Sequence, residues 1–164
     1  MRAHKAVKDP GSISGGPSFP PDQASGPEQP GVLREQLDFA LAIIGAAPSL
    51  TYVYDLSERR NIYISEQSRR VLGYGPAEIA AMESGVLARL LHPDDMPRVV
   101  QRFARIAECQ SDDIHELEYR MQHKDGAFVW LLSRDRVFKR DAAGRPTQIL
   151  GVATDITERK ISEE

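Results

Sequence analysis

Residues Ile114 to Ile156 read IHELEYRMQHKDGAFVWLLSRDRVFKRDAAGRPTQILGVATDI and indicate the fold class. Near its start Leu117, Tyr119 and Met121 alternate with charged residues, which is the period-two pattern of a half-buried strand. Two glycine-containing turns, at 124–126 and 141–144, divide the stretch into three apolar runs. It therefore predicts three consecutive antiparallel strands, a meander.

The first turn of this meander sets which side chains face one another. Asp125-Gly126 suits a two-residue hairpin loop, because type I′ turns need φ > 0 at both central residues and glycine adopts it freely. With that loop Met121 faces Trp130, and Tyr119 faces Leu132, across the strand pair. A curved sheet around an apolar hollow then requires Tyr119 and Trp130 to lie on the same side of the sheet.

Length, charge and cysteine content exclude several classes of protein. The 164 residues hold one domain plus a tail. The 24 acidic and 21 basic residues form no block of like charge, whereas binding to nucleic acid needs a clustered basic face. No apolar run approaches the roughly 20 residues that span a bilayer. Cys109 is the single cysteine, which fits a reducing compartment. We expect a cytoplasmic protein without a membrane span or a nucleic-acid partner.

The N-terminal part divides into a tail and a helix. Residues 1–31 are rich in Gly, Pro and Ser and are predicted to be a disordered tail, because such a segment buries too little apolar surface to offset its ordering entropy. Residues 32–45 are predicted to form a flanking helix. One stripe of it is apolar and consists of Leu33, Leu37, Ala40, Leu41 and Ile44. This stripe packs on the domain's own sheet, pairs with a partner subunit, or does both.

The middle of the chain predicts a hairpin and several helices. Residues 51–57 and 61–65 are strand candidates, and short helices follow from Ser65 and from Pro76. The longest helix is expected from Pro93 to Ala107. Its apolar face would hold Val99, Val100, Phe103, Ile106 and Ala107, while Arg98, Gln101, Arg102 and Arg105 would face water.

His92-Pro93-Asp94-Asp95 opens that helix and could also suggest a metal or haem ligand. Proline suits the first helical position, and the two aspartates suit the positive end of the helix dipole. No second ligand stands at a suitable spacing from His92. We therefore interpret these residues as a helix cap and expect no metal site.

This order of elements resembles the PAS domain, and most closely the PAS modules of the PAS-3-like group whose second half carries the PAC motif. The resemblance covers residues 32–160. Its motifs are Tyr63-Ile64-Ser65, Val71-Leu72-Gly73-Tyr74, His92-Pro93-Asp94-Asp95, Glu118-Tyr119-Arg120, Lys124-Asp125-Gly126 with Trp130, and Gly151 to Lys160. It implies an α+β fold with a five-stranded antiparallel sheet in the order 2-1-5-4-3 and short helices on one face. Residues 161–164 would begin a C-terminal linker helix.

The resemblance also implies a function. PAS modules of bacterial signalling proteins, including two-component systems, bind a small ligand or a partner. They relay a conformational change to an effector such as a histidine kinase or a diguanylate cyclase. Here the exit would be Asp155-Ile156-Thr157, with Asp155 or Thr157 bonded to the start of the following helix. The alternative is a ligand-free dimerisation or protein-interaction module. A homodimer through the N-terminal helix and the sheet face is expected in either case.

Alternation alone suggests which residues would line a pocket, although a plain hydrophobic core explains all of them equally well. The candidates are Tyr52, Tyr54, Leu72, Phe103, Tyr119, Met121, Trp130, Leu132, Ile149, Gly151 and Ala153. The identity of a ligand, or whether there is one, does not follow from the sequence.

Covalent and metal-based cofactors are disfavoured. Cys109 is followed by Gln110-Ser111, unlike the cysteine motif of flavin-adduct PAS modules, and it has no context for a covalently attached chromophore. The long helix holds no histidine for haem. Glu116 and Glu118 share a strand face, as catalytic carboxylates would, but that face lies opposite Tyr119. We expect no enzyme activity in this chain. A buried carboxylate or histidine with a strongly shifted pKa at the pocket mouth would instead favour an enzyme.

Overall fold

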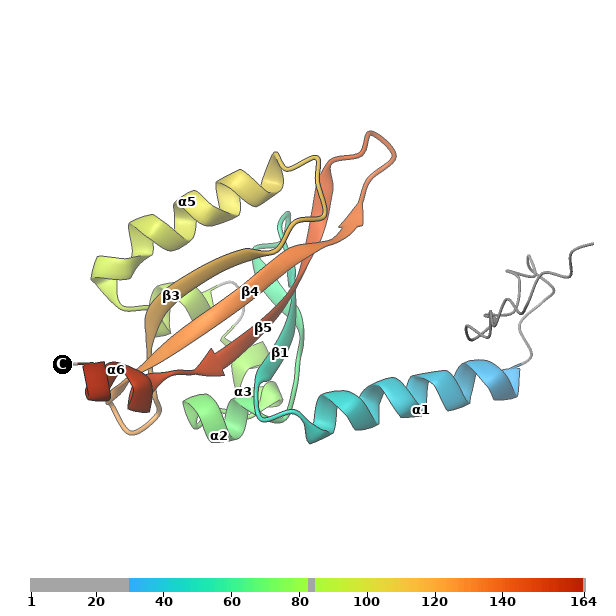
Figure 1. Ribbon diagram of the computed structural model, residues 1–164. Helices are drawn as coiled ribbons and strands as arrows, with labels where there is room; N and C mark the ends of the chain where they lie inside the picture. The colour runs from blue at the N-terminus through green and yellow to red at the C-terminus, as the bar shows by residue number, and fades with distance from the viewer. Residues whose placement is uncertain (1–29, 83–84, 164) are drawn as a thin grey trace, which may run out of the picture.

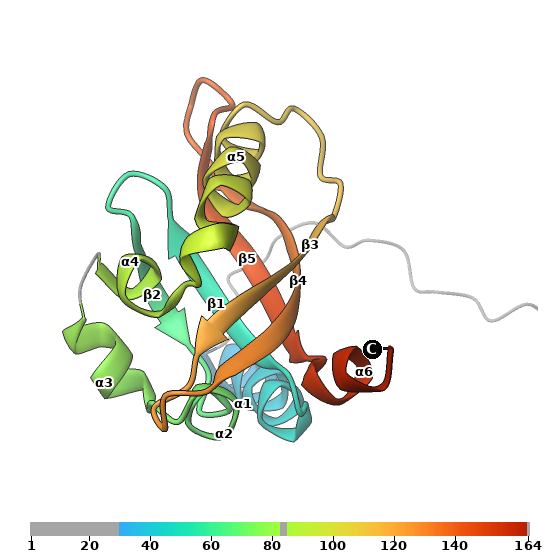
Figure 2. The ribbon, with the colours of Figure 1, turned by 90° about the vertical axis from the view of Figure 1, so that its left-hand side faces the viewer.

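The computed structural model describes residues 30–82 and 85–163. Its centre is one antiparallel sheet in the order β2-β1-β5-β4-β3, and this confirms both the α+β fold and the predicted strand order. Short helices and α5 lie along one face of the sheet (Figure 2). The predicted tail, apart from residues 30 and 31, lies outside the described residues. The strands are β1 Leu50–Asp55, β2 Arg60–Ile64, β3 His115–Gln122, β4 Phe128–Arg140 and β5 Pro146–Asp155.

The helices follow the expected order with several differences at their ends. α4 was not predicted, and α6 begins at Thr157 rather than at 161. The helices are α1 Pro30–Ala46, α2 Ser68–Leu72, α3 Pro76–Ala81, α4 Val86–Leu90, the 3₁₀ turn η2 Pro93–Asp95, α5 Met96–Ala107 and α6 Thr157–Glu163. The long helix predicted from Pro93 is thus a 3₁₀ turn followed by α5.

The inner face of the sheet carries the core. Tyr119 and Met121 of β3 are buried, as the alternation predicts, and Leu131 of β4 and Ile149 of β5 are fully enclosed. The residues immediately before and after each of them are more exposed and point to the other face, since successive side chains of a strand point in opposite directions. The inner faces of β1, β3, β4 and β5 together form the wall on which the helices pack.

The β3–β4 hairpin corrects the predicted register. Tyr119 pairs with Leu131, and Trp130 pairs with Arg120 on the opposite face. The loop is longer than two residues, because His123 N–H donates to Ala127 O at 2.7 Å and only Gly126 has a positive φ, of 96°. This longer loop moves the partner of Tyr119 by one residue, and a one-residue slip exchanges the two faces of a strand. The expectation that Tyr119 and Trp130 share a side was therefore wrong, while the curved sheet itself is present.

The flanking helix α1 does not pack on the domain's own sheet. Figure 1 shows it extending away from the sheet edge, and none of its residues is buried. Leu37, at the centre of its apolar stripe, is 56% exposed. The intramolecular interpretation of this helix was wrong: its apolar stripe is exposed from Leu33 to Leu41, and only Ile44 is partly buried.

Helix α5 faces the sheet differently from the prediction. Val100 is 57% exposed, whereas Arg102 is only 7% exposed. Val99, Arg102 and Ile106 follow the i, i+3, i+7 spacing of one helix face. Arg102 therefore points inward with the apolar residues despite its charge, and Val100 points away.

Candidate functional site

A small cavity of about 40 Å³ lies between the inner face of the sheet and helices α2 to α5. Its walls are almost entirely apolar and aromatic. It is one order of magnitude smaller than pockets that hold drug-sized ligands, which span about 300–1,000 Å³. Six of the predicted pocket residues line it, namely Tyr52, Tyr54, Leu72, Phe103, Tyr119 and Met121.

The other five predicted pocket residues do not line the cavity. Trp130 and Leu132 lie on the outer face of β4, because the register of the β3–β4 hairpin differs by one residue, and Leu131 takes the inner position instead. Ile149, Gly151 and Ala153 lie on the inner face of β5 and are buried in the core, opposite residues of β1.

A polar cluster that was not predicted from the sequence is buried beside this cavity. Arg102 Nη2 lies 2.8 Å from Asp135 Oδ2, and Arg102 Nη1 donates to Ser133 Oγ at 2.5 Å. The Tyr52 hydroxyl donates to Asp135 Oδ1. Asp135 is fully buried on β4 and Arg102 comes from α5. The position of Asp135, in phase with Leu131, was the available signal that this carboxylate points inward.

Burial has the largest effect on the pKa values of Asp135 and Tyr52 in this cluster. It raises the pKa of Asp135, while the nearby Arg102 guanidinium and the Tyr52 hydroxyl act in the opposite direction. Burial, and next the negative charge of Asp135, raise the pKa of Tyr52 well above its usual value. Tyr52 therefore remains protonated and serves as the donor to Asp135.

The predicted exit, Asp155-Ile156-Thr157, is fastened to β4. Asp155 Oδ1 accepts from the Thr157 backbone N–H at 2.9 Å and from its hydroxyl at 2.6 Å, as expected for a residue that bonds the start of the next helix. Thr157 Oγ1 accepts from the Trp130 N–H at 3.0 Å, and the Ile156 N–H donates to Trp130 O at 2.9 Å. Both the N–H and the C=O group of Trp130 thus form hydrogen bonds with residues at the start of α6.

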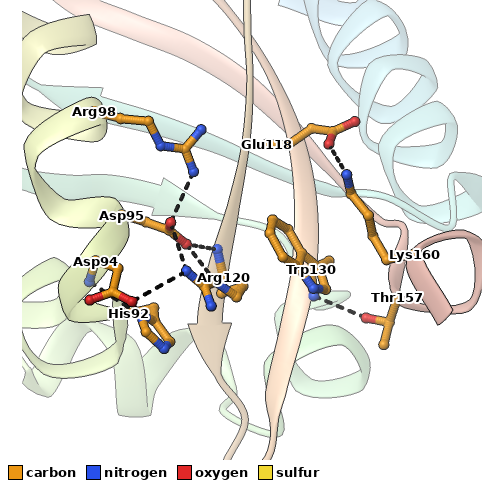
Figure 3. Close-up of polar contacts among 9 residues, drawn as sticks. All are labelled: His92, Asp94, Asp95, Arg98, Glu118, Arg120, Trp130, Thr157 and Lys160. Atoms are coloured by element: carbon orange, nitrogen blue, oxygen red, sulfur yellow. Dashed lines mark hydrogen bonds and ion pairs between the residues drawn. The ribbon is translucent and has the colours of Figure 1, made fainter. Parts of the chain in front are cut away.

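The Trp130 side chain lies on the outer face among three charged residues (Figure 3). Arg120 of β3 and Lys160 of α6 both lie over its ring, at 5.0 Å and 4.9 Å from the centroid, which is the geometry of cation–π contacts. Lys160 Nζ also contacts Glu118 Oε2 at 2.5 Å. Hydrogen bonds first from Lys160 and also from Arg159 lower the pKa of Glu118.

The two carboxylates of β3 each take part in ion pairs. Glu118 binds α6, and Glu116 Oε1 lies 2.6 Å from Arg134 Nε. Both side chains are on the face opposite Tyr119, away from the cavity. Their geometry is that of ion pairs on the outer face of the sheet.

Asp95 connects the start of α5 to the same strand. Its carboxylate accepts from Arg120 at the backbone N–H and at Nε, both at 2.9 Å, and from Arg98 Nη2 at 2.9 Å. These hydrogen bonds, those from Arg120 above all, hold the pKa of the buried Asp95 far below its usual value. Arg120 is thereby shared between Asp95 and the ring of Trp130 (Figure 3).

His92 takes the capping role that its sequence context predicts. Its Nδ1 accepts from the Asp94 N–H at 3.2 Å. Within residues 30–82 and 85–163, no three His, Cys, Asp or Glu side chains gather as a metal site would require.

The chain belongs to the family described as the PAS fold. The family model matches residues 61–153, which is more than half of the chain. The match includes α2 to α5 and strands β3 and β4, whereas β1 lies before it and the end of β5 lies just beyond it. The domain is a PAS sensory domain homologous to domains of histidine kinases and diguanylate cyclases.

Three relatives illustrate this family. The two-component sensor PprA of Pseudomonas aeruginosa is 26% identical over 125 residues, or 75% of this chain, but the match covers only 13% of that protein. A sensory box histidine kinase/response regulator from Burkholderia thailandensis has a TM-score of 0.60 and 28% identity, over 76% of this chain and 88% of that one.

The third is the N-terminal domain of a diguanylate cyclase with PAS/PAC sensor from Marinobacter aquaeolei. It has a TM-score of 0.57 and 27% identity, over 68% of this chain and 98% of that one. No helix in the described part of this chain combines the length and hydropathy of a membrane span.

Proposed function

We propose that this PAS domain is the input module of a bacterial signalling protein. A ligand or partner shifts its conformation, and the shift leaves through Asp155-Ile156-Thr157 to an effector such as a histidine kinase or a diguanylate cyclase. The observation that carries this proposal is the position of Trp130. Its backbone holds the start of α6, and its side chain contacts both α6 and the strand bonded to α5.

The proposed route begins at α5, which lines the cavity with Val99, Arg102 and Phe103. Asp95 at the start of the same helix binds Arg120, and Arg120 contacts Trp130. A small displacement of α5 would therefore change the contacts that hold α6. Such coupling requires two arrangements of this network whose populations the input biases.

The test joins a diguanylate cyclase output domain to the end of α6 and measures the cyclase rate. Asp155→Ala removes the acceptor for Thr157, and we expect it to change the cyclase rate several-fold while the domain keeps its thermal transition. Asp112→Ala, at an exposed aspartate far from the exit in sequence, is the matched control. An unchanged rate in a folded Asp155→Ala variant, or a change that only accompanies unfolding, would contradict the proposal.

A ligand-free dimerisation module is the second candidate, and two observations favour it. The cavity of about 40 Å³ is small, and the apolar stripe of α1 is exposed. A second copy of α1 would cover this stripe, as in other amphipathic helix pairs. In sedimentation experiments Leu37→Glu should shift a dimer towards monomer, while Arg34→Glu on the polar face should not. A wild-type chain that stays monomeric would exclude this candidate.

An enzymatic role has one feature in its favour, the buried Asp135 with its raised pKa. Asp135 is paired with Arg102 and Tyr52 and is not part of the cavity wall. We therefore infer that it is structural, and that any catalysis belongs to a separate effector. The cytoplasmic location expected from the single cysteine stays a prediction.

A further inference from the structure

The edge strand β2 and helix α3 lie next to each other (Figure 2) and line an open groove on the surface of the domain. The groove has a volume of about 330 Å³, which lies at the lower end of the range for ligand pockets. All of its lining residues except Asn61 are apolar or aromatic. The groove is therefore much larger than the buried cavity beside α5.

The walls of this groove are open to solvent. Ile62 and Tyr63 of β2 are 43% and 38% exposed, and Ala77 and Ala80 of α3 are exposed as well. β2 is the last strand on its side of the sheet, and no backbone hydrogen bond joins it to α3, both of which the structure describes completely. Single apolar residues are common on a protein surface, but a hollow lined by a contiguous set of them indicates a docking surface.

The chain itself contains a segment that suits this groove. Residues 1–29 hold four large apolar side chains, which are Met1, Val7, Ile13 and Phe19. Only Phe19 has a proline within two residues on each side, in the sequence Pro17-Ser18-Phe19-Pro20-Pro21. Proline fixes φ, so such a segment loses little conformational entropy when it binds, and proline-rich peptides dock in apolar grooves with aromatic walls. Tyr63 and Pro76 provide walls of this kind.

The length of chain before α1 allows this segment to reach the groove. The 17 residues of α1 make a helix about 25 Å long. Its last turn is held beside α2, because the Gln67 side chain donates to two carbonyl oxygens of that turn at 3.2 and 2.9 Å. Ile64, in the wall of the groove, is three residues from Gln67 and therefore at most about 11 Å away.

These lengths add up to about 36 Å. The eleven peptide steps from Pro30 back to Phe19 span up to about 36–40 Å when fully extended. The segment can therefore return along α1 to the groove, with little length to spare. Addition of the segment to β2 as a further strand is disfavoured, because proline has no N–H for a strand ladder.

We propose that residues 17–21 dock in the groove between β2 and α3 of the same chain, with the ring of Phe19 against the exposed alanines of α3. The segment is then an intramolecular ligand of the domain. Ile64 and Ile79 line both the groove and the buried cavity, so a docked segment restrains two residues of the cavity wall. This inference goes beyond the proposed function and depends on neither of its two candidates.

The test measures nuclear Overhauser effects in the full, isotope-labelled chain, between the ring protons of Phe19 and the methyl groups of Ala77 and Ala80. We expect these effects in the wild type, at intensities that do not depend on protein concentration. Ala80→Glu should weaken them at least about five-fold, because a docked ring would bury the new carboxylate. Ala81→Glu is the matched control, since Ala81 is exposed on the same helix but does not line the groove.

A change at the other partner should give the same answer. Phe19→Ala should shift the methyl resonances of Ala77 and Ala80, because it removes the largest apolar group of the segment. Ile13→Ala removes an apolar side chain from the same part of the sequence and should leave both resonances in place.

The length of the connecting segment provides the sharpest variant. Deletion of residues 23–26 shortens the reach by about 13–14 Å and should abolish the Overhauser effects, although Phe19 and the groove are both retained. A duplication of the same four residues should preserve them. If Ala80→Glu does not fold, the deletion still decides the question, because it leaves residues 30–163 unchanged.

Three results would overturn the inference. The first is the absence of these Overhauser effects in the wild type, and the second is their persistence after the deletion. The third is their appearance only between differently labelled copies in a mixed sample, which would assign the groove to a second chain. None of these results would alter the cyclase readout of Asp155→Ala.

Discussion

The backbone N–H of Trp130 donates to the hydroxyl oxygen of Thr157 at 3.0 Å. This bond joins the second residue after the end of β5 to the middle strand of the β3-β4-β5 half of the sheet. Since Trp130 O also accepts from Ile156, the path of the chain from β5 into α6 is set by one residue of β4. The proposed exit is therefore held by defined hydrogen bonds to β4.

Thr157→Val should loosen this junction without disturbing the core. The substitution keeps the shape of the side chain but removes the acceptor for Trp130 and the donor to Asp155. We expect a loss of about 1 kcal/mol in the free energy of unfolding and faster amide exchange at Trp130 and in α6. Thr154→Val on the exposed face of β5 is the control. Unchanged exchange at Trp130 would show that the hydroxyl does not hold the exit.

The contact between α6 and β3 should be weak and sensitive to salt. Glu118 and Lys160 form a partly exposed ion pair, and such pairs contribute about 0.2–1 kcal/mol. A double-mutant cycle with Glu118→Gln and Lys160→Met should give a coupling energy in that range, decreasing at high salt.

Trp130 provides a second readout of that contact, because it is the single tryptophan of the chain. Its fluorescence should change in Lys160→Met, since Lys160 lies over the ring. Glu116→Gln breaks a pair with Arg134 on the same face and should leave the emission as it is. The same emission from both variants would argue against docking of α6 on Trp130.

Asp95→Asn should destabilise the domain in a pH-dependent way. The pKa of Asp95 is depressed in the folded state, so its stabilisation is fully present above the unfolded pKa of about 3.9 and is lost as the pH falls below it. At pH 7 we expect a loss of about 2 kcal/mol in the free energy of unfolding. The difference from the wild type should begin to shrink below about pH 4, where the carboxylate becomes protonated in the unfolded chain, and should vanish only as the pH falls through the lower pKa of the folded state.

Asp94→Asn is the control for this prediction, because the Asp94 side chain is exposed and lies 4.0 Å from Arg120. It should change the free energy of unfolding by less than about 0.5 kcal/mol. A constant difference between Asp95→Asn and the wild type at pH 3 and pH 7 would show that the carboxylate charge is not what stabilises this contact.

Gly151→Ala should be poorly tolerated, because a Cβ at this position would collide with Asp135 Oδ1 and the ring of Tyr52. Overpacking of this kind costs about 1–3 kcal/mol, and here it would also push apart the bonded pair of Tyr52 and Asp135. Chemical denaturation measures the loss. Gly45→Ala, with open space around its Cβ, should not lower the stability, and similar results for both variants would contradict the close packing at β5.

Local patterns predicted the faces of strands well where no turn intervened. Alternation placed Tyr52, Tyr54, Tyr119 and Met121 inside, because the two-residue period of a strand is rigid. The predicted sheet face of Trp130 was wrong because that face depends on the number of residues in the β3–β4 loop. Asp-Gly is compatible with several loop lengths. A difference of one residue there exchanges inside and outside for all of β4.

The buried polar cluster of Arg102 and Asp135 was not predicted, for a different reason. Arg102 was predicted to face water and Asp135 was not assigned to a face, although both side chains are buried on the inner side. A buried charge is tolerated only with a partner, and the partner came from an element about thirty residues away, which local patterns do not reveal. The exposure of the apolar stripe of α1 likewise could not be predicted from the sequence. An amphipathic helix has the same sequence pattern whether it packs on its own sheet or on a second chain.

We propose that a change in the wall of the cavity reaches α6. The test is hydrogen exchange in Val99→Ala, which enlarges the cavity at a buried position of α5. The two reporters are the Lys160 N–H, bonded to Ile156 O in α6, and the Leu56 N–H, bonded to Thr147 O at the far end of β5. We predict that protection from hydrogen exchange falls more at the Lys160 amide than at the Leu56 amide. An equal fall at both amides would mean that α6 senses only global stability, and would contradict the relay.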